Sequence, residues 1–272
     1  MSTILKLVQG TDEWHEHRLR YRNASEAPAV MEVSPWVSPY QLWELKTKRK
    51  VQEVNFAMQR GSAMEPLARA AYEAESGSIM EPCVMVDGEY SASLDGVSFD
   101  GSLLLEVKCP MKGRESDTWK KAESGKVQPC YYWQLQHQLM VSGAEIAHFY
   151  VFDGEVGLLV EVLPNHDDME KLRLAWDNFI AFIDSDSPPP LTTSDTVMRN
   201  DPEWKDAAED YVTAKRASEV AVEAIEAAKK KLCGLAQHNS EKGYGVAVSK
   251  FWKANSTKQE VRVSLCKGEV SC

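Results

Sequence analysis

An aspartate, Asp95, and a Glu-x-Lys pair, Glu106 and Lys108, constrain the fold of this chain more than any other feature of its sequence. In a β-strand, residues two apart point to the same face, so Glu106 and Lys108 project together while Val107 points the other way into the core. We expect Asp95 to follow a short strand, with Gly96 allowing the turn that brings the chain back. The pattern therefore predicts two consecutive strands that carry two carboxylates and a lysine close together.

These side chains suit a particular chemistry. Two carboxylates make a site of hard oxygen ligands for Mg²⁺, which binds through few carboxylates and keeps several waters. A lysine beside such an ion can hold or deprotonate a water for attack on phosphorus. A lone Glu-x-Lys more often belongs to a solvated strand edge. Here the leucines at 103–105 lead into Glu106 and predict a central strand, where a solvated pair is unusual.

The apolar periodicity of the chain predicts an α/β (α+β) fold with a C-terminal extension. Residues 1–185 are expected to form the core, residues 186–202 a linker, and residues 203–272 a helix followed by a hairpin. In the core we expect helices at 12–20, 61–76, 129–142 and 166–184, another helix opened by Ser38-Pro39, and strands at 79–86, 89–94, 103–109, 145–153 and 156–163.

The extension allows two interpretations. Its alanine-rich helix, over residues 203–232, has a thin apolar seam that could pack on the body of the protein, which we favour, or on another protein. A hairpin over 244–251 and 259–265 places Phe251 and Trp252 near lysines 250, 253 and 258. Such a group could stack on single-stranded bases, although simple packing of the two aromatic rings is the favoured interpretation.

Composition limits the remaining possibilities. The 272 residues carry a net charge of −10, which argues against a sequence-independent DNA-binding protein unless its basic groups are confined to one channel. No apolar run is long enough to cross a membrane, and the N-terminus lacks a signal-peptide pattern, so we expect a cytoplasmic protein. The six cysteines are scattered and look like reduced thiols.

Six short motifs over residues 8–185 give the chain a resemblance to a known family. It resembles the lambda-type exonucleases, the YqaJ viral recombinase family of the PD-(D/E)xK nuclease superfamily. One departure is Leu94, which stands where the superfamily name has proline. The motifs are Gln9-Gly-x-x-x-Trp14-x-x-x-Arg18, Asn23-Ala-Ser25-Glu26, Gly61-x-x-x-Glu65, Ser93-x-Asp95-Gly96, Leu105-Glu106-Val107-Lys108-Cys109-Pro110 and Tyr132-x-Gln134-x-Gln136.

The resemblance implies a restriction-endonuclease-like core, with a central mixed sheet flanked by helices, and a phage or prophage alkaline exonuclease. Such an enzyme degrades the 5′-ended strand of linear double-stranded DNA in the bacterial host cell. It leaves a 3′ overhang for a phage single-strand annealing protein. It uses Mg²⁺, for which Mn²⁺ can substitute, and forms a homotrimeric ring whose channel would hold the basic groups.

The resemblance also implies roles for individual residues. Asp95 and Glu106 would bind Mg²⁺ together with the backbone carbonyl of Val107, and Glu65 would be a further acidic ligand. Lys108 would position or activate the attacking water, and Gln134 would hold the lysine or the water. Without the resemblance, Glu65 reads as a salt-bridged helix glutamate and Gln134 as a core amide.

The DNA end would be held by a second group. The resemblance points to Arg18 and Ser25 for the 5′-phosphate, with Ser93 and Arg114 as further candidates; a guanidinium suits bidentate contact with a terminal phosphate. Phe56 and Met58 are candidate wedges that unstack the end of the duplex.

Two other functions remain open from the sequence. One is an endonuclease or repair nuclease of the same superfamily, and the other is a catalytically inactive scaffold that recruits an annealing partner. Cleavage of covalently closed circles would favour the first, and inactivity on linear duplex with Mg²⁺ would favour the second.

Overall fold

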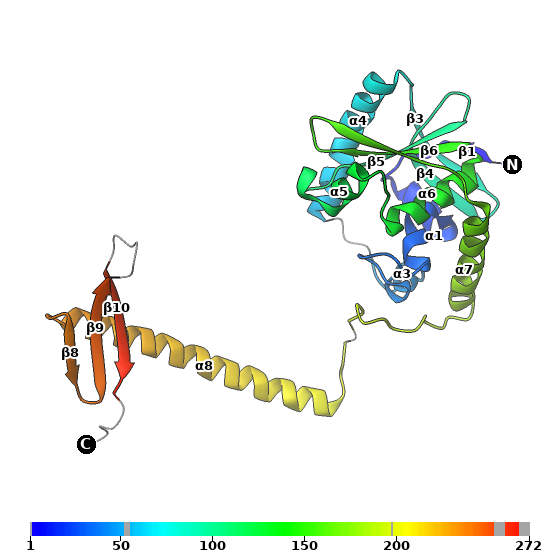
Figure 1. The fold of residues 1–272 in the computed structure, drawn as a ribbon. Coiled ribbons are helices and arrows are strands. Elements are labelled where there is room, and N and C mark those ends of the chain that lie inside the picture. Colours follow the sequence, from blue (N-terminus) through cyan, green and yellow to red (C-terminus); the bar gives the residue numbers. More distant parts are fainter. Residues whose placement is uncertain (1, 52–54, 197, 253–258, 267–272) are drawn as a thin grey trace. The chain divides into compact units, whose positions relative to one another are not determined.

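The computed structural model describes residues 2–51, 55–196, 198–252 and 259–266. It divides the chain into two compact units, Met1–Thr196 and Val197–Cys272, which we describe separately. Figure 1 shows the course of the chain, with most of the helices and strands of both units labelled.

The first unit is built on a mixed sheet of seven strands among the described residues. The strands follow the order β1-β3-β4-β5-β6-β7, with β2 paired to β4 beside this path. Neighbours are antiparallel except for the parallel pairs β5–β6 and β2–β4. The bounds are β1 Thr3–Leu5, β2 Arg22–Asn23, β3 Glu81–Asp87, β4 Tyr90–Val97, β5 Leu103–Lys108, β6 Ile146–Phe152 and β7 Gly157–Val162.

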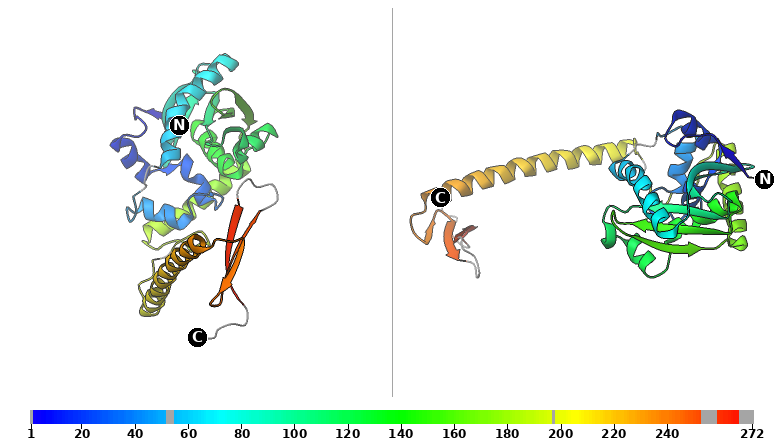
Figure 2. Two further views of the ribbon diagram at one scale, coloured as in Figure 1. Left: turned by 90° about the vertical axis from the view of Figure 1, so that its left-hand side faces the viewer. Right: turned by 90° about the horizontal axis from the view of Figure 1, so that it is seen from above.

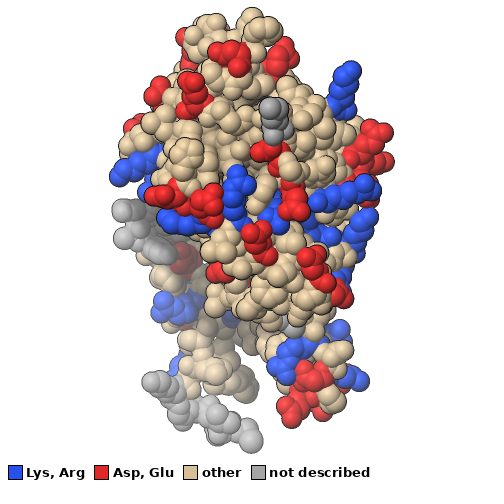
Figure 3. Space-filling view, turned by 90° about the vertical axis from the view of Figure 1, so that its right-hand side faces the viewer, with Lys and Arg blue, Asp and Glu red and all other residues tan. Residues whose placement is uncertain are grey.

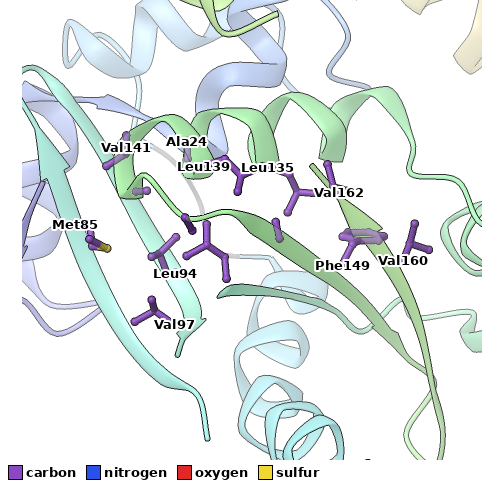
Figure 4. Close-up of a cluster of buried hydrophobic side chains, with 14 of the residues drawn as sticks. Ala24, Met85, Leu94, Val97, Leu135, Leu139, Val141, Phe149, Val160 and Val162 are labelled. Carbon is purple, nitrogen blue, oxygen red and sulfur yellow. The ribbon is translucent and has the colours of Figure 1, made fainter. Parts of the chain in front are cut away.

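Helices cover both faces of this sheet, because its central strands are apolar on both sides. Helix α4, Phe56–Ser76, packs on one face, where Tyr72 contacts a buried cluster that includes Val107 and Tyr150. Helices α5, Asp117–Glu123, and α6, Pro129–Ser142, pack on the other face. In Figure 4, Leu135 and Leu139 of α6 lie over the strands beside Leu94 and Phe149.

The N-terminal segment joins the α6 side of the sheet (Figures 1 and 2). Leu42 and Trp43 pack against Leu172, Trp176 and Phe179 in a second apolar cluster. The elements on this side are α1 Asp12–Arg20, the 3₁₀ turn η1 Ala24–Glu26, α2 Ala27–Val30, α3 Pro39–Lys46 and α7 His166–Asp184, and a second 3₁₀ turn, η2 Gly113–Glu115, precedes α5.

The mixed sheet flanked by helices confirms the predicted fold class, and β5 is a central strand as expected. Two details differ. Helix α4 begins at Phe56 and not at residue 61, because Asn55 caps it by accepting a hydrogen bond from the Met58 amide. Strand β4 continues through Asp95 to Val97, so Gly96 is not in a turn. A Cβ at Gly96 would lie 2.7 Å from the Met80 Cβ, so this glycine is needed for close packing.

The first unit also extends past residue 185, into the segment expected to be a linker. Asp195 accepts a hydrogen bond from the Ser38 hydroxyl, which attaches the segment to the start of α3, and another from the Thr192 amide within the segment itself. Short strand β1 was not expected from the sequence, because three residues are too few to show a periodic pattern.

The second unit contains one long helix and a three-stranded antiparallel sheet in the order β10-β9-β8. The bounds are α8 Pro202–Leu235, β8 Ser240–Gly243, β9 Val246–Trp252 and β10 Gln259–Leu265. Phe251 is the residue on which the Arg262 guanidinium stacks. Lys253 and Lys258, which we expected near the hairpin turn, lie outside the described residues. None of the helices described is both long and apolar enough to cross a membrane.

Candidate active site

A cavity of about 340 Å³ opens where strands β4 and β5 separate. The two strands pair only at Gly96–Leu105 and Val97–Leu104, so Asp95 and Glu106 occupy the first position past the pairing. The cavity is lined by residues from five parts of the first unit: Gln9, Trp14, Arg18, Asn23, Ala24, Ser25, Ala57, Gly61, Glu65, Ser93, Asp95, Glu106, Val107, Lys108, Cys109, Pro110, Tyr131 and Gln134.

Side chains replace the backbone ladder where the strands part. The Val107 amide donates to Asp95 Oδ2 at 2.8 Å, and Arg69 of α4 donates to the Asp95 carbonyl oxygen at 2.7 Å. Buried backbone groups need such partners once the ladder ends. Asp95 is therefore fixed from both sides, by β5 and by α4.

Glu106 is the most completely bonded carboxylate of the cavity and is only 2% exposed. Its Oε1 accepts from Lys108 and, at 2.6 Å, from Gln134 Nε2. Its Oε2 accepts from Gln138 Nε2, also at 2.6 Å. Gln134 and Gln138 are four residues apart on α6 and share a face, so one helix supplies an amide to each oxygen. Gln138 was not among the residues expected in the site, although this spacing is visible in the sequence.

The charges are strongly coupled because the groups are buried together. Burial raises the pKa of Asp95 well above its usual range, and the Glu106 and Glu65 carboxylates raise it further. Burial lowers the pKa of Lys108, but Glu106 and Asp95 outweigh this and raise it above its usual value. A cavity that concentrates negative charge around Asp95 favours a bound cation.

The donors fit a magnesium ion through a small number of protein ligands. Mg²⁺ is commonly held by one or two carboxylates and substrate phosphates, with waters completing the octahedron. Asp95 and Glu106 supply hard oxygens of this kind. Glu65 lines the same cavity, but its Oε1 accepts from Arg69 at 3.1 Å, which is the salt-bridged arrangement expected of a helix glutamate. In the part of the chain that the structure describes, no three Asp, Glu, His or Cys side chains form a ready-made metal cluster.

A second group of polar side chains lines the same cavity. Arg18 Nη2 donates to the Ser25 hydroxyl at 3.1 Å, and its guanidinium lies 4.7 Å from the centre of the Trp14 ring. Trp14 Nε1 in turn donates to the Ser93 hydroxyl at 3.0 Å. The N-terminal helix α1 thus places a cation beside the strand that carries Asp95.

The remaining predicted site residues lie outside this cavity. Arg114 pairs with Asp153 at 2.5 Å on the surface. Phe56 and Met58 stand on the first turn of α4 with 68% and 40% of their surface exposed. Met58 lines a neighbouring cavity, which shares Trp14 and Arg18 with the first.

Glu26 and Lys46 form a buried pair behind Arg18 that was not expected from the sequence. Glu26 appeared only inside the Asn23-Ala-Ser25-Glu26 motif, and Lys46 belongs to a cluster of basic residues in which nothing in the sequence marks a buried partner. Only the contact between η1 and α3 brings them together.

This chain is similar to a known domain family and to a curated protein that share the name YqaJ. Residues 13–145 match the YqaJ-like viral recombinase domain family. The uncharacterized protein YqaJ of Bacillus subtilis (strain 168) is 26% identical over 167 residues. The match covers 58% of this chain and 51% of the length of that protein.

Two solved structures of an alkaline exonuclease from Laribacter hongkongensis are also similar. The first is 28% identical, with a TM-score of 0.54, and covers 65% of this chain and 94% of that one. The second, a complex of the same exonuclease with dAMP, is 25% identical with a TM-score of 0.56 and the same coverage. These similarities confirm the restriction-endonuclease-like core and support a nuclease function.

Proposed function

Because residues 13–145 are a YqaJ-like viral recombinase domain, we propose that this chain is a Mg²⁺-dependent exonuclease that degrades the 5′-ended strand of linear duplex DNA. The observation that carries the proposal is one cavity that contains Asp95, Glu106 and Lys108 together with Arg18. A cleavage centre and a cation for the terminal phosphate within one small cavity suit an enzyme that works from ends.

The side chains of the cavity would have separate roles in cleavage. Mg²⁺, when bound by Asp95, Glu106 and the Val107 carbonyl, would polarise the scissile phosphate and lower the pKa of a water. Lys108 holds the attacking water, and its raised pKa keeps it a hydrogen-bond donor. Gln134 and Gln138 hold the Glu106 carboxylate in place from α6. Glu65, on α4, would be a further acidic residue toward the metal.

The group around Arg18 would select the DNA end. Arg18, with the hydroxyls of Ser25 and Ser93, binds the 5′-phosphate as a charge-assisted hydrogen-bond donor. The net charge of −10 makes a general electrostatic grip on DNA weak. On the face drawn in Figure 3, Lys and Arg side chains are interspersed with Asp and Glu and form no continuous basic surface.

The rest of the proposal follows from the family resemblance. The product would be a 3′ overhang for a phage single-strand annealing protein, and three chains would form a ring around the duplex. Mn²⁺ would substitute for Mg²⁺, since an oxygen-rich site accepts both. A molecular mass in solution near that of three chains is the expected result for the ring.

The test is digestion of linear duplex that carries either a 5′-phosphate or a 5′-hydroxyl, with a label at one end, with and without Mg²⁺. We expect loss of the 5′-ended strand only with the metal, and faster loss from the phosphorylated end. Metal-independent cleavage, or degradation that starts at the 3′ end, would reject the proposal.

A further inference from the structure

Behind the wall that carries Arg18 lies a buried cluster of charges from three segments of the chain. Glu26, at the end of η1, accepts from Lys46 Nζ of α3 at 2.6 Å and from Arg18 Nη2 of α1 at 3.2 Å. Asn23 Nδ2 donates at 2.9 Å to Glu26 Oε2, the same oxygen that Lys46 contacts. The Lys46 side chain is only 4% exposed and that of Glu26 only 11%.

The cluster also closes the end of helix α1. Lys46 Nζ donates to the carbonyl oxygens of Arg18 and Tyr21 at 2.6 Å each, and Asn23 Nδ2 donates to the same two oxygens. These carbonyls have no helical partner, and a buried helix end needs such donors. Lys46 therefore fixes the backbone of Arg18 directly, and it holds the carboxylate that the Arg18 side chain contacts.

The charges of this cluster do not balance. Two cations, Arg18 and Lys46, share one carboxylate, Glu26, which leaves an excess of one positive charge. Among the residues that the structure describes, neither cation has a second carboxylate in an ion pair. The excess extends to a neighbour: the pKa of His17 is lowered by burial first and then by Lys46 and Arg18. Buried charges without a partner are costly, so a site of this kind favours an anionic ligand.

Arg18 is the member of this cluster that reaches the cavity of Asp95. Arg18 and Ser25 line the cavity that holds Asp95, whereas Lys46 and Glu26 line the neighbouring cavity and not this one. Lys46 thus has no direct access to a ligand in the first cavity and can act on it only through Arg18. It does so by holding Glu26, which would otherwise pair with Arg18 alone and neutralise it.

We propose that Lys46, acting through Glu26, is a positioning residue that keeps the Arg18 guanidinium oriented and only partly neutralised, so that it selects ends with a terminal phosphate monoester. The inference rests on the proposed function and deepens it. It assigns the discrimination between phosphorylated and unphosphorylated ends to a buried residue that never contacts the DNA.

The experiment compares binding of two duplexes that differ only in a 5′-phosphate or a 5′-hydroxyl. It is done in EDTA, so that no strand is cut, by fluorescence anisotropy. The readout is the ratio of the two dissociation constants, because a general loss of folded protein changes both constants and cancels in the ratio. We expect Lys46→Met to reduce the preference for the phosphate about tenfold, the scale of one charge-assisted hydrogen bond.

A double-mutant cycle separates positioning from general damage. In an Arg18→Ala background, Lys46→Met should change the ratio no further, because its effect passes through the guanidinium. Lys48→Met is the matched control, since Lys48 is exposed and pairs with Glu16 on the surface; it should leave the ratio unchanged. Lys46→Arg, which keeps the charge, should retain most of the preference.

The other results of these binding measurements separate failure of the positioning role from failure of the proposed function. An unchanged ratio in folded Lys46→Met, or a further fall in the Arg18→Ala background, overturns the positioning role. If Lys46→Met does not fold, Lys46→Gln removes the charge, leaves Glu26 in place and keeps an amide donor, and it should still lose the preference; a retained preference overturns the proposal. If the wild-type protein binds both duplexes equally, the end-binding part of the proposed function fails as well. If the wild-type protein prefers the phosphorylated duplex in EDTA but cuts neither duplex with Mg²⁺, only the assigned catalytic chemistry is rejected.

Discussion

Gln138 gives the sharpest test of how the cleavage centre is organised. Its amide donates to Glu106 Oε2 at 2.6 Å, and the side chain is 1% exposed. Gln138→Leu keeps the approximate volume and removes this donor. A hydrogen bond to a charged group contributes about 1.5–3 kcal/mol, and each 1.36 kcal/mol is tenfold in rate, so kcat should fall about 10- to 150-fold.

Gln136 provides a matched control on the same helix. It is also fully buried, but it donates to the Leu163 carbonyl and accepts from the Asn165 amide, away from the cavity. Gln136→Leu should therefore lower the melting temperature with little change in kcat. The assay is exonuclease turnover on saturating linear duplex, with thermal unfolding of each variant alongside. Equal losses of kcat in both variants, or full activity in Gln138→Leu, would refute the reasoning.

Three further predictions follow from the same structure. Lys108→Ala should abolish cleavage while end binding in EDTA remains, because the ligands and Arg18 are untouched; measurable turnover would reject the role of Lys108. Burial lowers the pKa of His137 to about 3, so this side chain stays neutral in the fold while the unfolded chain takes up a proton near pH 6.5. The stability that comes from keeping His137 neutral is complete above pH 6.5 and is lost as the pH falls toward 3, with about 2 kcal/mol lost by pH 5. Urea unfolding at pH 7 and pH 5 should show this loss in the wild type and not in His137→Gln. Equal losses in the two proteins would exclude His137 as the source. Gly157→Ala places a Cβ 1.9 Å from Tyr150 Cζ, so it should reduce the free energy of unfolding by at least about 1–3 kcal/mol, and an unchanged urea midpoint would contradict the packing.

The parts of the site that were predictable from the sequence depend on local periodicity. Alternation along β5 placed Glu106 and Lys108 on one side and Val107 in the core, and the structure has this arrangement. Helical spacing placed Gln134 and Gln138 on one face of α6. Both patterns need only the geometry of one element.

The parts that were not predictable depend on contacts between elements. The separation of β4 from β5 at Asp95 arises from pairing that stops after two residues, which no local pattern reveals. Nothing in the local sequence distinguishes Lys46 from its basic neighbours, and only the packing of α3 against η1 buries it beside Glu26. Arg114 and Phe56 carry the expected chemistry in the sequence, but the fold leaves both outside the cavity.

The central claim is that cleavage and end recognition share one cavity, and it is tested most directly by comparing linear and covalently closed circular forms of one duplex. With Mg²⁺, we expect complete loss of the 5′-ended strand from the linear form, while the closed circle stays intact and becomes a substrate only after it is linearised. Nicking or linearisation of the closed circle by the wild-type protein, absent in Lys108→Ala, would show that the cavity cuts without an end and would contradict the account.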